Sequence, residues 1–268
     1  SSDLIAGRVA NRIGGGGFRL DGRHHALAAN EGASTMLHGG PRGFSRRNWS
    51  IEAADEGSVT LALVSEDGDQ GFPGRVETRC RYRLSEAATL AVEIEATTDA
   101  PTPVNPTNHA YFTLSEGGDC RDHLLRIAAA HYTPVDAAMI PTGAIAPVAG
   151  TPFDFRALRP IGEDYDVNYA LDGAPGEGVL AAEAIAPDGR LRLEVETDQP
   201  GLQLYTAQWL APAAAEAGGP RIGPRAGFCL EAQGFPDAPN KRQFPSVTLR
   251  PGETFRHRTV FRFSAISR

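Results

Sequence analysis

The strongest constraint on the fold of this chain is a strict alternation of apolar and charged side chains in several short segments. In residues 76–84 the alternating sets are Val76, Thr78, Cys80, Tyr82 and Leu84 on one side, and Glu77, Arg79, Arg81 and Arg83 on the other. Successive side chains of a β-strand point to opposite faces, so a period of two residues predicts a strand with one buried face. The pattern recurs in residues 90–95 and 191–196, and it is typical of antiparallel sheets.

Turn signals separate the predicted strands. Asp21-Gly22, Asp67-Gly68 and Asp188-Gly189 are dipeptides that favour hairpin turns. No long segment carries the 3.6-residue apolar period of a helix, and the alanine-rich residues 211–217, interrupted by a proline, are predicted to form a loop. We therefore expect an all-β fold in which two large antiparallel sheets pack as a β-sandwich.

Length and composition set limits on organisation and partners. A chain of 268 residues fits one large β-domain, so we expect a single domain over residues 1–268. The net charge of −7 and the scattered basic residues favour a small neutral substrate over nucleic acid or an anionic membrane.

Three widely spaced cysteines without a CxxC pair suggest isolated thiols in a reducing compartment. We expect a cytoplasmic protein, or a periplasmic one if a longer natural N-terminus carries a signal peptide.

Three segments place a polar side chain in surroundings that suit chemistry. His109 lies in the sequence NPTNHAYF, and His38 precedes two glycines that allow a ligand to approach the backbone closely. A lone histidine in such a segment is more often structural. Glu231 lies in the apolar segment FCLEAQ, where burial is expected to raise the pKa of a carboxyl group. Such a carboxylate is a candidate general base.

Two further patterns resemble binding sites only in composition. The glycine run 14–17 lacks the Lys-Ser/Thr pair and the following helix of a phosphate loop, so we interpret it as a strand-end loop. His24 and His25 are adjacent in a predicted strand and should point to opposite faces, where they cannot bind one ion together. We expect no metal site.

Eight motifs follow one another in an order that resembles a known family. They are GRVANRI (residues 7–13), LHGG with RGF (37–44), DGDQGFPG (67–74), TNHAYF (107–112), YTPVDAAMIPTG (132–143), GTPFDFR (150–156), TDQPGLQLYT (197–206) and FPDAPNKRQFPSVTLRPGE (235–253). Together they resemble the aldose 1-epimerases, also called galactose mutarotases, over essentially the whole chain. The resemblance implies a large antiparallel β-sandwich of the galactose mutarotase-like supersandwich type, with an open sugar cleft and no cofactor. Family members normally carry several strands before the GRVANRI segment, so we expect the family's usual N-terminal strands to be missing here.

The resemblance also implies roles for particular residues. His109 would be the general acid and Glu231 the general base. The residues implied to hold or line the sugar are Asn11, Arg12, His38, Tyr111, Asp166 and Gln203. Asn11 and Gln203 could instead only satisfy hydrogen bonds at strand edges.

Anomer exchange requires residues of these two types. The proton of the anomeric hydroxyl must leave while the ring oxygen gains one, so one base and one acid are needed. A histidine, with an ordinary pKa of about 6.5, can donate a proton near pH 7, and a partly desolvated glutamate is a better acceptor than a hydrated one. We expect an enzyme that interconverts the α and β anomers of a free aldohexose such as galactose or glucose, acting as a monomer or homodimer.

Two alternatives to this enzymatic function stay open. The chain could be a non-catalytic sugar-binding or regulatory module on the same fold. It could also act on a hexose 6-phosphate, for which Arg42, Arg46 and Arg47 are the clustered basic residues.

Four departures from the family pattern bear on specificity and leave the preferred sugar open. They are Pro106, Thr113, Val167 and Ala232.

Overall fold

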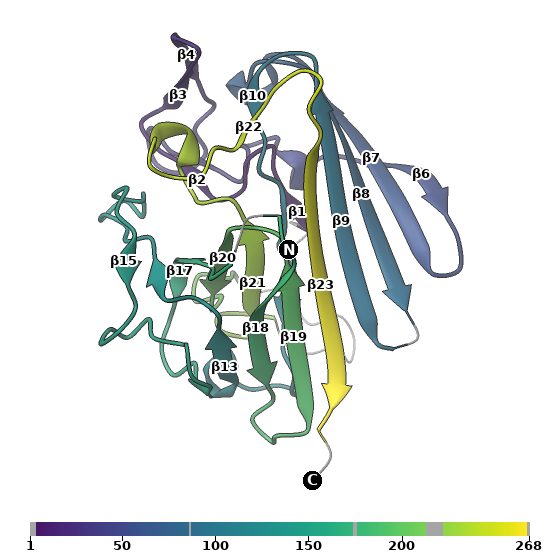
Figure 1. Ribbon diagram of the computed structural model, residues 1–268, viewed down its shortest axis with the longest axis vertical. Coiled ribbons are helices and arrows are strands. Elements are labelled where there is room, and N and C mark those ends of the chain that lie inside the picture. The colour runs from purple at the N-terminus through teal and green to yellow at the C-terminus, as the bar shows by residue number, and fades with distance from the viewer. Residues whose placement is uncertain (1–3, 86, 174–175, 213–221, 267–268) are drawn as a thin grey trace.

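The computed structural model describes residues 4–85, 87–173, 176–212 and 222–266, and two large antiparallel sheets form the body of the fold (Figure 1). Helical structure in these residues is limited to the 3₁₀ turns η1 (Phe44–Arg46), η2 (Asp69–Gly71), η3 (Cys120–Asp122) and η4 (Ala238–Asn240). In the described part of the chain, no helix has the length and apolar character needed to span a membrane. The prediction of an all-β sandwich is confirmed. Residues 213–217 of the expected alanine-rich loop lie outside the described residues.

The larger sheet has nine strands among the described residues. In spatial order they are β16 (Arg159–Pro160), β13 (Leu124–Ile127), β18 (Val179–Ile185), β19 (Leu191–Thr197), β23 (Phe255–Ala265), β9 (Thr89–Thr98), β8 (Val76–Ser85), β7 (Ser58–Ser65) and β6 (Ser50–Ala54). The three segments with strict alternation form β8, β9 and β19, as predicted. Val76 and Cys80 are fully buried, whereas Leu84 is 65% exposed because it lies at the turn end of β8, outside the core.

The smaller sheet has six strands in the described residues. In spatial order they are β12 (Tyr111–Phe112), β21 (Phe228–Gln233), β20 (Gly201–Tyr205), β17 (Asp166–Ala170), β14 (His131–Tyr132) and β15 (Ala146–Pro147). Leu202, Leu204 and Leu230 of this sheet share one core cluster with Val195 and Ile94 of the larger sheet. The core therefore lies between the two sheets, and the other face of the smaller sheet can carry polar groups.

Short strand pairs complete the fold at one end of the sandwich. They are β1 (Ile5–Ala6) with β11 (Thr107–Asn108), β10 (Thr102–Pro103) with β22 (Thr248–Leu249), β2 (Arg12–Ile13) with β5 (Met36–Leu37), and β3 (Gly17–Leu20) with β4 (Arg23–Ala26). Asp21 and Gly22 join β3 to β4 with φ values of 48° and 82°, the two positive values of a type I′ turn. The Asp67-Gly68 and Asp188-Gly189 pairs also lie between paired neighbouring strands, but in the longer connections 66–75 and 186–190.

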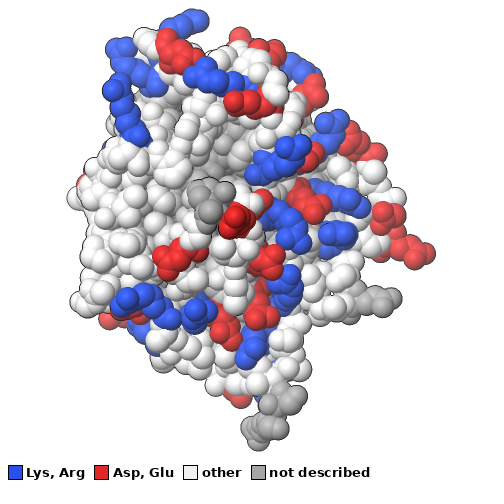
Figure 2. All heavy atoms as spheres, viewed as in Figure 1, with Lys and Arg blue, Asp and Glu red and all other residues white. Residues whose placement is uncertain are grey.

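Acidic and basic side chains are interspersed on the outer face of the larger sheet (Figure 2). Arg256 pairs with Glu95 at 3.4 Å and Arg258 with Glu93 at 3.7 Å across β23 and β9. These pairs are exposed, and such pairs contribute about 0–1 kcal/mol each. This face therefore mixes charges of both signs.

A buried arginine fixes the N-terminal segment against the larger sheet. The guanidinium of Arg8 donates to the carbonyls of Pro73 and Gly74 at 2.9 and 3.0 Å and to Oγ of Ser65 at 2.6 Å. The backbone of Val9 forms a bridge to Asn105 just before β11. These contacts bring the segment that carries Asn11 and Arg12 to the polar face of the smaller sheet.

Candidate active site

Cross-strand register places polar side chains in two rows on the outer face of the six-stranded sheet. The first row is Tyr111, Cys229, Tyr205 and Asp166, on strands β12, β21, β20 and β17. The second row is Glu231, Gln203 and Asn168, two residues further along the same strands. Residues opposite one another in an antiparallel sheet point to the same side. The intervening leucines point into the core, so one face of this sheet is a polar surface.

His109 and Glu231 form a buried pair on this surface. Nε2 of His109 lies 3.5 Å from Oε1 of Glu231, and the two side chains are 7% and 2% exposed. Burial raises the pKa of Glu231 to about 7, against the opposing effect of His109 and with a smaller contribution from Asp166. A carboxyl group with this pKa can both accept and return a proton near neutral pH.

Aromatic rings hold the imidazole of His109 from several sides. Tyr111 stacks on it with centroids 5.2 Å apart, and Tyr205 meets it edge-on at 6.4 Å. His38 approaches from another element with a centroid distance of 5.1 Å. Sγ of Cys229 lies 3.5 Å from Nδ1 of His109. The ring therefore has a carboxylate at one nitrogen and a thiol at the other.

Backbone conformation explains how His38 reaches this position. Both His38 and Asn11 have positive φ values, 52° and 58°, which are rare for residues with a side chain. The backbone N–H of Asn11 donates to Nδ1 of His38 at 3.2 Å, which leaves the proton of the neutral ring on Nε2. Burial lowers the pKa of His38 to about 3, so the ring is a neutral donor at physiological pH. A Cβ at Gly39 would lie 1.9 Å from the carbonyl oxygen of Gly7, so the following residue must be glycine.

A chain of charged and amide groups continues from Arg12. Glu31 accepts from Nε and Nη2 of Arg12 at 2.6 and 2.9 Å, and Asp166 accepts from Nη1 at 3.4 Å. The other carboxylate oxygen of Asp166 accepts from Nε2 of Gln203 at 2.6 Å. The bidentate contact with Glu31 fixes the planar guanidinium, which in turn orients Asp166.

Arg12, Asp166 and Gln203 border a small pocket of about 10 Å³, the space of a single water molecule. It is lined by Asn11, Arg12, Thr133, Val135, Met139, Pro141, Asp166, Asn168, Gln203 and Pro236. Three buried oxygens at the site have no hydrogen-bond partner among the described residues: Oε2 of Glu231, Oε1 of Gln203 and Oδ1 of Asn168. An unpaired buried polar group costs about 1–3 kcal/mol. Hydroxyl groups of a ligand that donated to these three oxygens would remove that cost.

All eight residues that the resemblance implies lie in this one connected cluster. Sequence reasoning missed four others that belong to it, namely Glu31, Asn168, Tyr205 and Cys229. The departures from the family pattern lie elsewhere. Val167 and Ala232 face the core between the sheets, Thr113 is exposed, and the carbonyl of Pro106 contacts Nδ1 of His257 at 3.1 Å.

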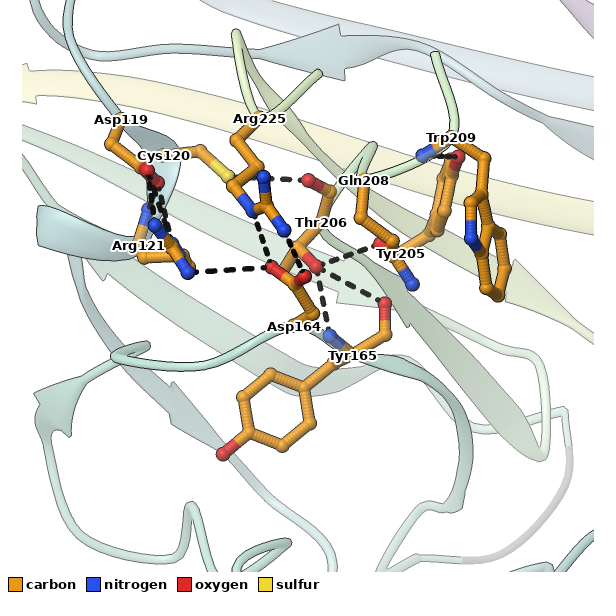
Figure 3. A network of polar contacts seen from close by, with 10 residues as sticks. All are labelled: Asp119, Cys120, Arg121, Asp164, Tyr165, Tyr205, Thr206, Gln208, Trp209 and Arg225. Carbon is orange, nitrogen blue, oxygen red and sulfur yellow. Dashed lines mark hydrogen bonds and ion pairs between the residues drawn. The ribbon is translucent and has the colours of Figure 1, made fainter.

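An ion-pair network supports the loops at the end of β20 (Figure 3). Arg225 donates to Asp164 in a bidentate contact, and Arg121 lies 3.7 Å from the same carboxylate. The adjoining hydroxyl of Tyr205 accepts from the amide of Trp209 at 3.2 Å. This bond and the stacking of Trp209 on Tyr205 restrict the Tyr205 ring that meets His109.

The geometry around His109 also bears on metal binding. Within the described ranges, His109, Cys229 and Glu231 form a group in which one possible ligand atom from each lies within 4.8 Å of the others. Cys229 faces Nδ1 of the imidazole, whereas Glu231 faces Nε2. An ion bound at Nδ1 would have Cys229 beside it but Glu231 at the other ring nitrogen. An ion bound at Nε2 would have Glu231 beside it but Cys229 at the other nitrogen. The arrangement therefore suits a hydrogen-bonded chain better than a shared ion.

Comparison with known proteins gives a consistent answer. Residues 3–262 match the family described as aldose 1-epimerase. A galactose mutarotase from Rattus norvegicus is 42% identical over 97% of this chain and 78% of its own length, and an aldose 1-epimerase from Escherichia coli K12 is 38% identical over 97% and 79%.

Solved structures agree with the sequence relatives. A GalM/aldose epimerase homologue from C. elegans has a TM-score of 0.91 and 29% identity, covering 98% of this chain and 82% of that one. A galactose 1-epimerase from Lactobacillus acidophilus NCFM has a TM-score of 0.85 and 30% identity, covering 100% and 82%. This chain therefore belongs to the aldose 1-epimerase family.

Proposed function

We propose that this chain is an isomerase that interconverts the α and β anomers of a free aldohexose, galactose or glucose, with His109 as general acid and Glu231 as general base. The observation that carries the proposal is the buried pair itself, in which Nε2 of His109 and Oε1 of Glu231 lie 3.5 Å apart. Oε2 of Glu231 is buried without a hydrogen-bond partner among the described residues, so it has a free acceptor position for a substrate hydroxyl that reaches it.

The reaction opens and recloses one hemiacetal. Glu231 takes the proton of the anomeric hydroxyl while His109 gives a proton from Nε2 to the ring oxygen, and the bond from C1 to the ring oxygen breaks. Rotation about C1–C2 presents the other face of the aldehyde. In reclosure the ring oxygen attacks C1 and returns its proton to His109, and the carbonyl oxygen takes the proton back from Glu231. Both residues are then in their starting states.

The remaining polar residues would bind and orient the sugar. Neutral His38 can donate to a sugar oxygen, and Arg12 can stabilise charge that develops near the ring. Asp166 and Gln203, joined by a 2.6 Å hydrogen bond, offer acceptors and donors to hydroxyl groups.

Polarimetry on freshly dissolved α-galactose and α-glucose tests this function. The expected result is a rate of optical rotation change that grows in proportion to protein concentration. A rate equal to the spontaneous one for both sugars would contradict the proposal. Sugar binding without acceleration would instead favour a non-catalytic binding module.

A phosphorylated substrate has weaker support. Arg47, one of the three clustered arginines, is held by Asp69 at 2.8 Å and by the carbonyl of Val64 at 2.7 Å. Its charge is therefore already paired. Acceleration with glucose 6-phosphate but not with glucose would reverse this assignment.

Substitution of a binding residue should affect affinity more than turnover. Asp166→Asn is expected to raise KM about tenfold, equal to about 1.4 kcal/mol, with a smaller change in kcat. Because Asp166 also raises the pKa of Glu231, the acidic limb of the pH profile should move to lower pH. Steady-state kinetics from pH 5 to 9 check both effects, with exposed Asp188→Asn as the control. An unchanged KM would argue against sugar contact at Asp166.

We further propose that the chain acts as one domain, as a monomer or homodimer, in the cytoplasm. Support comes from the core cluster that both large sheets share and from Cys80, Cys120 and Cys229, which are buried free thiols. Light scattering of the purified protein measures its oligomeric state.

A further inference from the structure

Cys229 occupies the centre of the polar row beneath His109. Its cross-strand neighbours are Tyr111 on one side and Tyr205 on the other, and its side chain is fully buried. The sulfur lies 3.5 Å from Nδ1 of His109, within hydrogen-bond distance for a thiol. The cysteine therefore touches a residue of the proposed proton-transfer pair directly.

Stacking alone does not decide which edge of the imidazole faces the substrate. Tyr111 covers the flat side of the His109 ring, and a ring turned by half a revolution about its Cβ–Cγ bond would fill almost the same volume. The two orientations differ in their hydrogen bonds, because the flipped ring presents carbon atoms where nitrogens now lie. In the observed orientation Nδ1 meets Cys229 and Nε2 meets Glu231.

A thiol can satisfy Nδ1 in both protonation states of the ring. Burial raises the pKa of Cys229 well above its ordinary value, and the carboxylates of Glu231 and Asp166 add to this effect. A hydrogen bond with Tyr111 opposes it only in part, so the group stays protonated. Its sulfur can accept weakly from Nδ1–H in the imidazolium and also in the neutral ring that remains after Nε2 has given up its proton. A carboxylate in this place would stabilise the imidazolium strongly and make it a poorer proton donor.

We propose that Cys229 is a positioning residue whose thiol holds Nδ1 of His109, so that the catalytic proton enters and leaves the ring at Nε2 alone. The inference rests on the proposed function, since the proton is the one exchanged with the sugar ring oxygen. It assigns the cysteine a part in the reaction without contact to the substrate.

Two substitutions separate positioning from packing. Cys229→Ala removes the hydrogen-bonding group and is expected to lower kcat about ten- to hundredfold with KM changed less than threefold, as misplacement of a catalytic group does. Cys229→Ser restores a donor and acceptor and should return kcat to within about fivefold of wild type. If the cysteine only filled space, serine would be no better than alanine, since both are smaller than cysteine. Cys120→Ala is the matched control, because Cys120 is buried and its sulfur lies 3.5 Å from the carbonyl of Thr206.

Nitrogen NMR of protein labelled in its histidines gives a readout that does not depend on activity. His109 is identified by the signal that disappears in His109→Asn. Wild type and Cys229→Ser should show two well-separated imidazole nitrogen shifts, whereas in Cys229→Ala the two should converge toward a tautomeric average. Unchanged shifts and unchanged kcat in Cys229→Ala, or equal losses in alanine and serine variants, would overturn the proposal. If the wild type does not accelerate anomerisation, the proposed function fails, while the NMR result still decides whether the thiol orients the ring.

Discussion

Glu231→Gln is expected to lower kcat about a thousandfold while leaving sugar affinity within a few fold of wild type. The amide keeps the size of the side chain but cannot take the proton of the anomeric hydroxyl, and general acid–base catalysis typically contributes about 10²–10⁴ in rate. Stopped-flow polarimetry measures the rate and calorimetry the affinity. Glu95→Gln on the outer face of the larger sheet is the control. A loss below tenfold would contradict the role of Glu231 as base.

The same substitution should stabilise the fold at alkaline pH. The pKa of Glu231 is about 7 in the folded protein against an ordinary value of 4.5, so the folded state binds more protons than the unfolded state between these values. The free energy of unfolding therefore falls as pH rises from about 4.5 to about 7, by at most about 3 kcal/mol from this group. Glu231→Gln removes this loss. Its melting temperature should exceed that of wild type at pH 8, and the difference should shrink towards pH 4.5.

His109→Asn is the second change with a large expected effect. It removes the group that protonates the ring oxygen, and we expect kcat to fall by about 10²–10⁴. Because acid and base act in one step, the double variant with Glu231→Gln should be little slower than the slower single variant. His131→Asn, an exposed change on the smaller sheet, is the control. Additive losses in the double variant would indicate that the two residues act independently.

Long strands could be predicted from the sequence, and short ones could not. β8, β9 and β19 contain seven to ten residues each, enough for a period of two to be visible. β2, β5 and β12 have two residues each, which is too few for any period. These short strands nevertheless carry Arg12 and Tyr111 and end beside His38. These short strands were therefore reached only through the order of the family motifs.

Register explains why some site residues were missed. Tyr205 and Cys229 are 24 positions apart in the chain but lie directly opposite one another in the sheet. Asn168 and Gln203 are likewise distant in the chain and opposite in the sheet. A shift of one residue would turn Glu231 into the core and an apolar neighbour outwards, and a single sequence does not specify that register. Glu31 was missed for a related reason, because its contact with Arg12 depends on the path of a loop.

The central claim is that this chain exchanges anomers through His109 and Glu231, and exchange NMR of a sugar at anomeric equilibrium tests it most directly. Cross-peaks between the α and β anomeric protons of galactose or glucose report the interconversion rate without any coupled reaction. We expect strong cross-peaks with wild type and none above the spontaneous level with Glu231→Gln or His109→Asn, all three proteins being folded. Wild-type protein that leaves the spontaneous rate unchanged, or variants as active as wild type, would contradict the account.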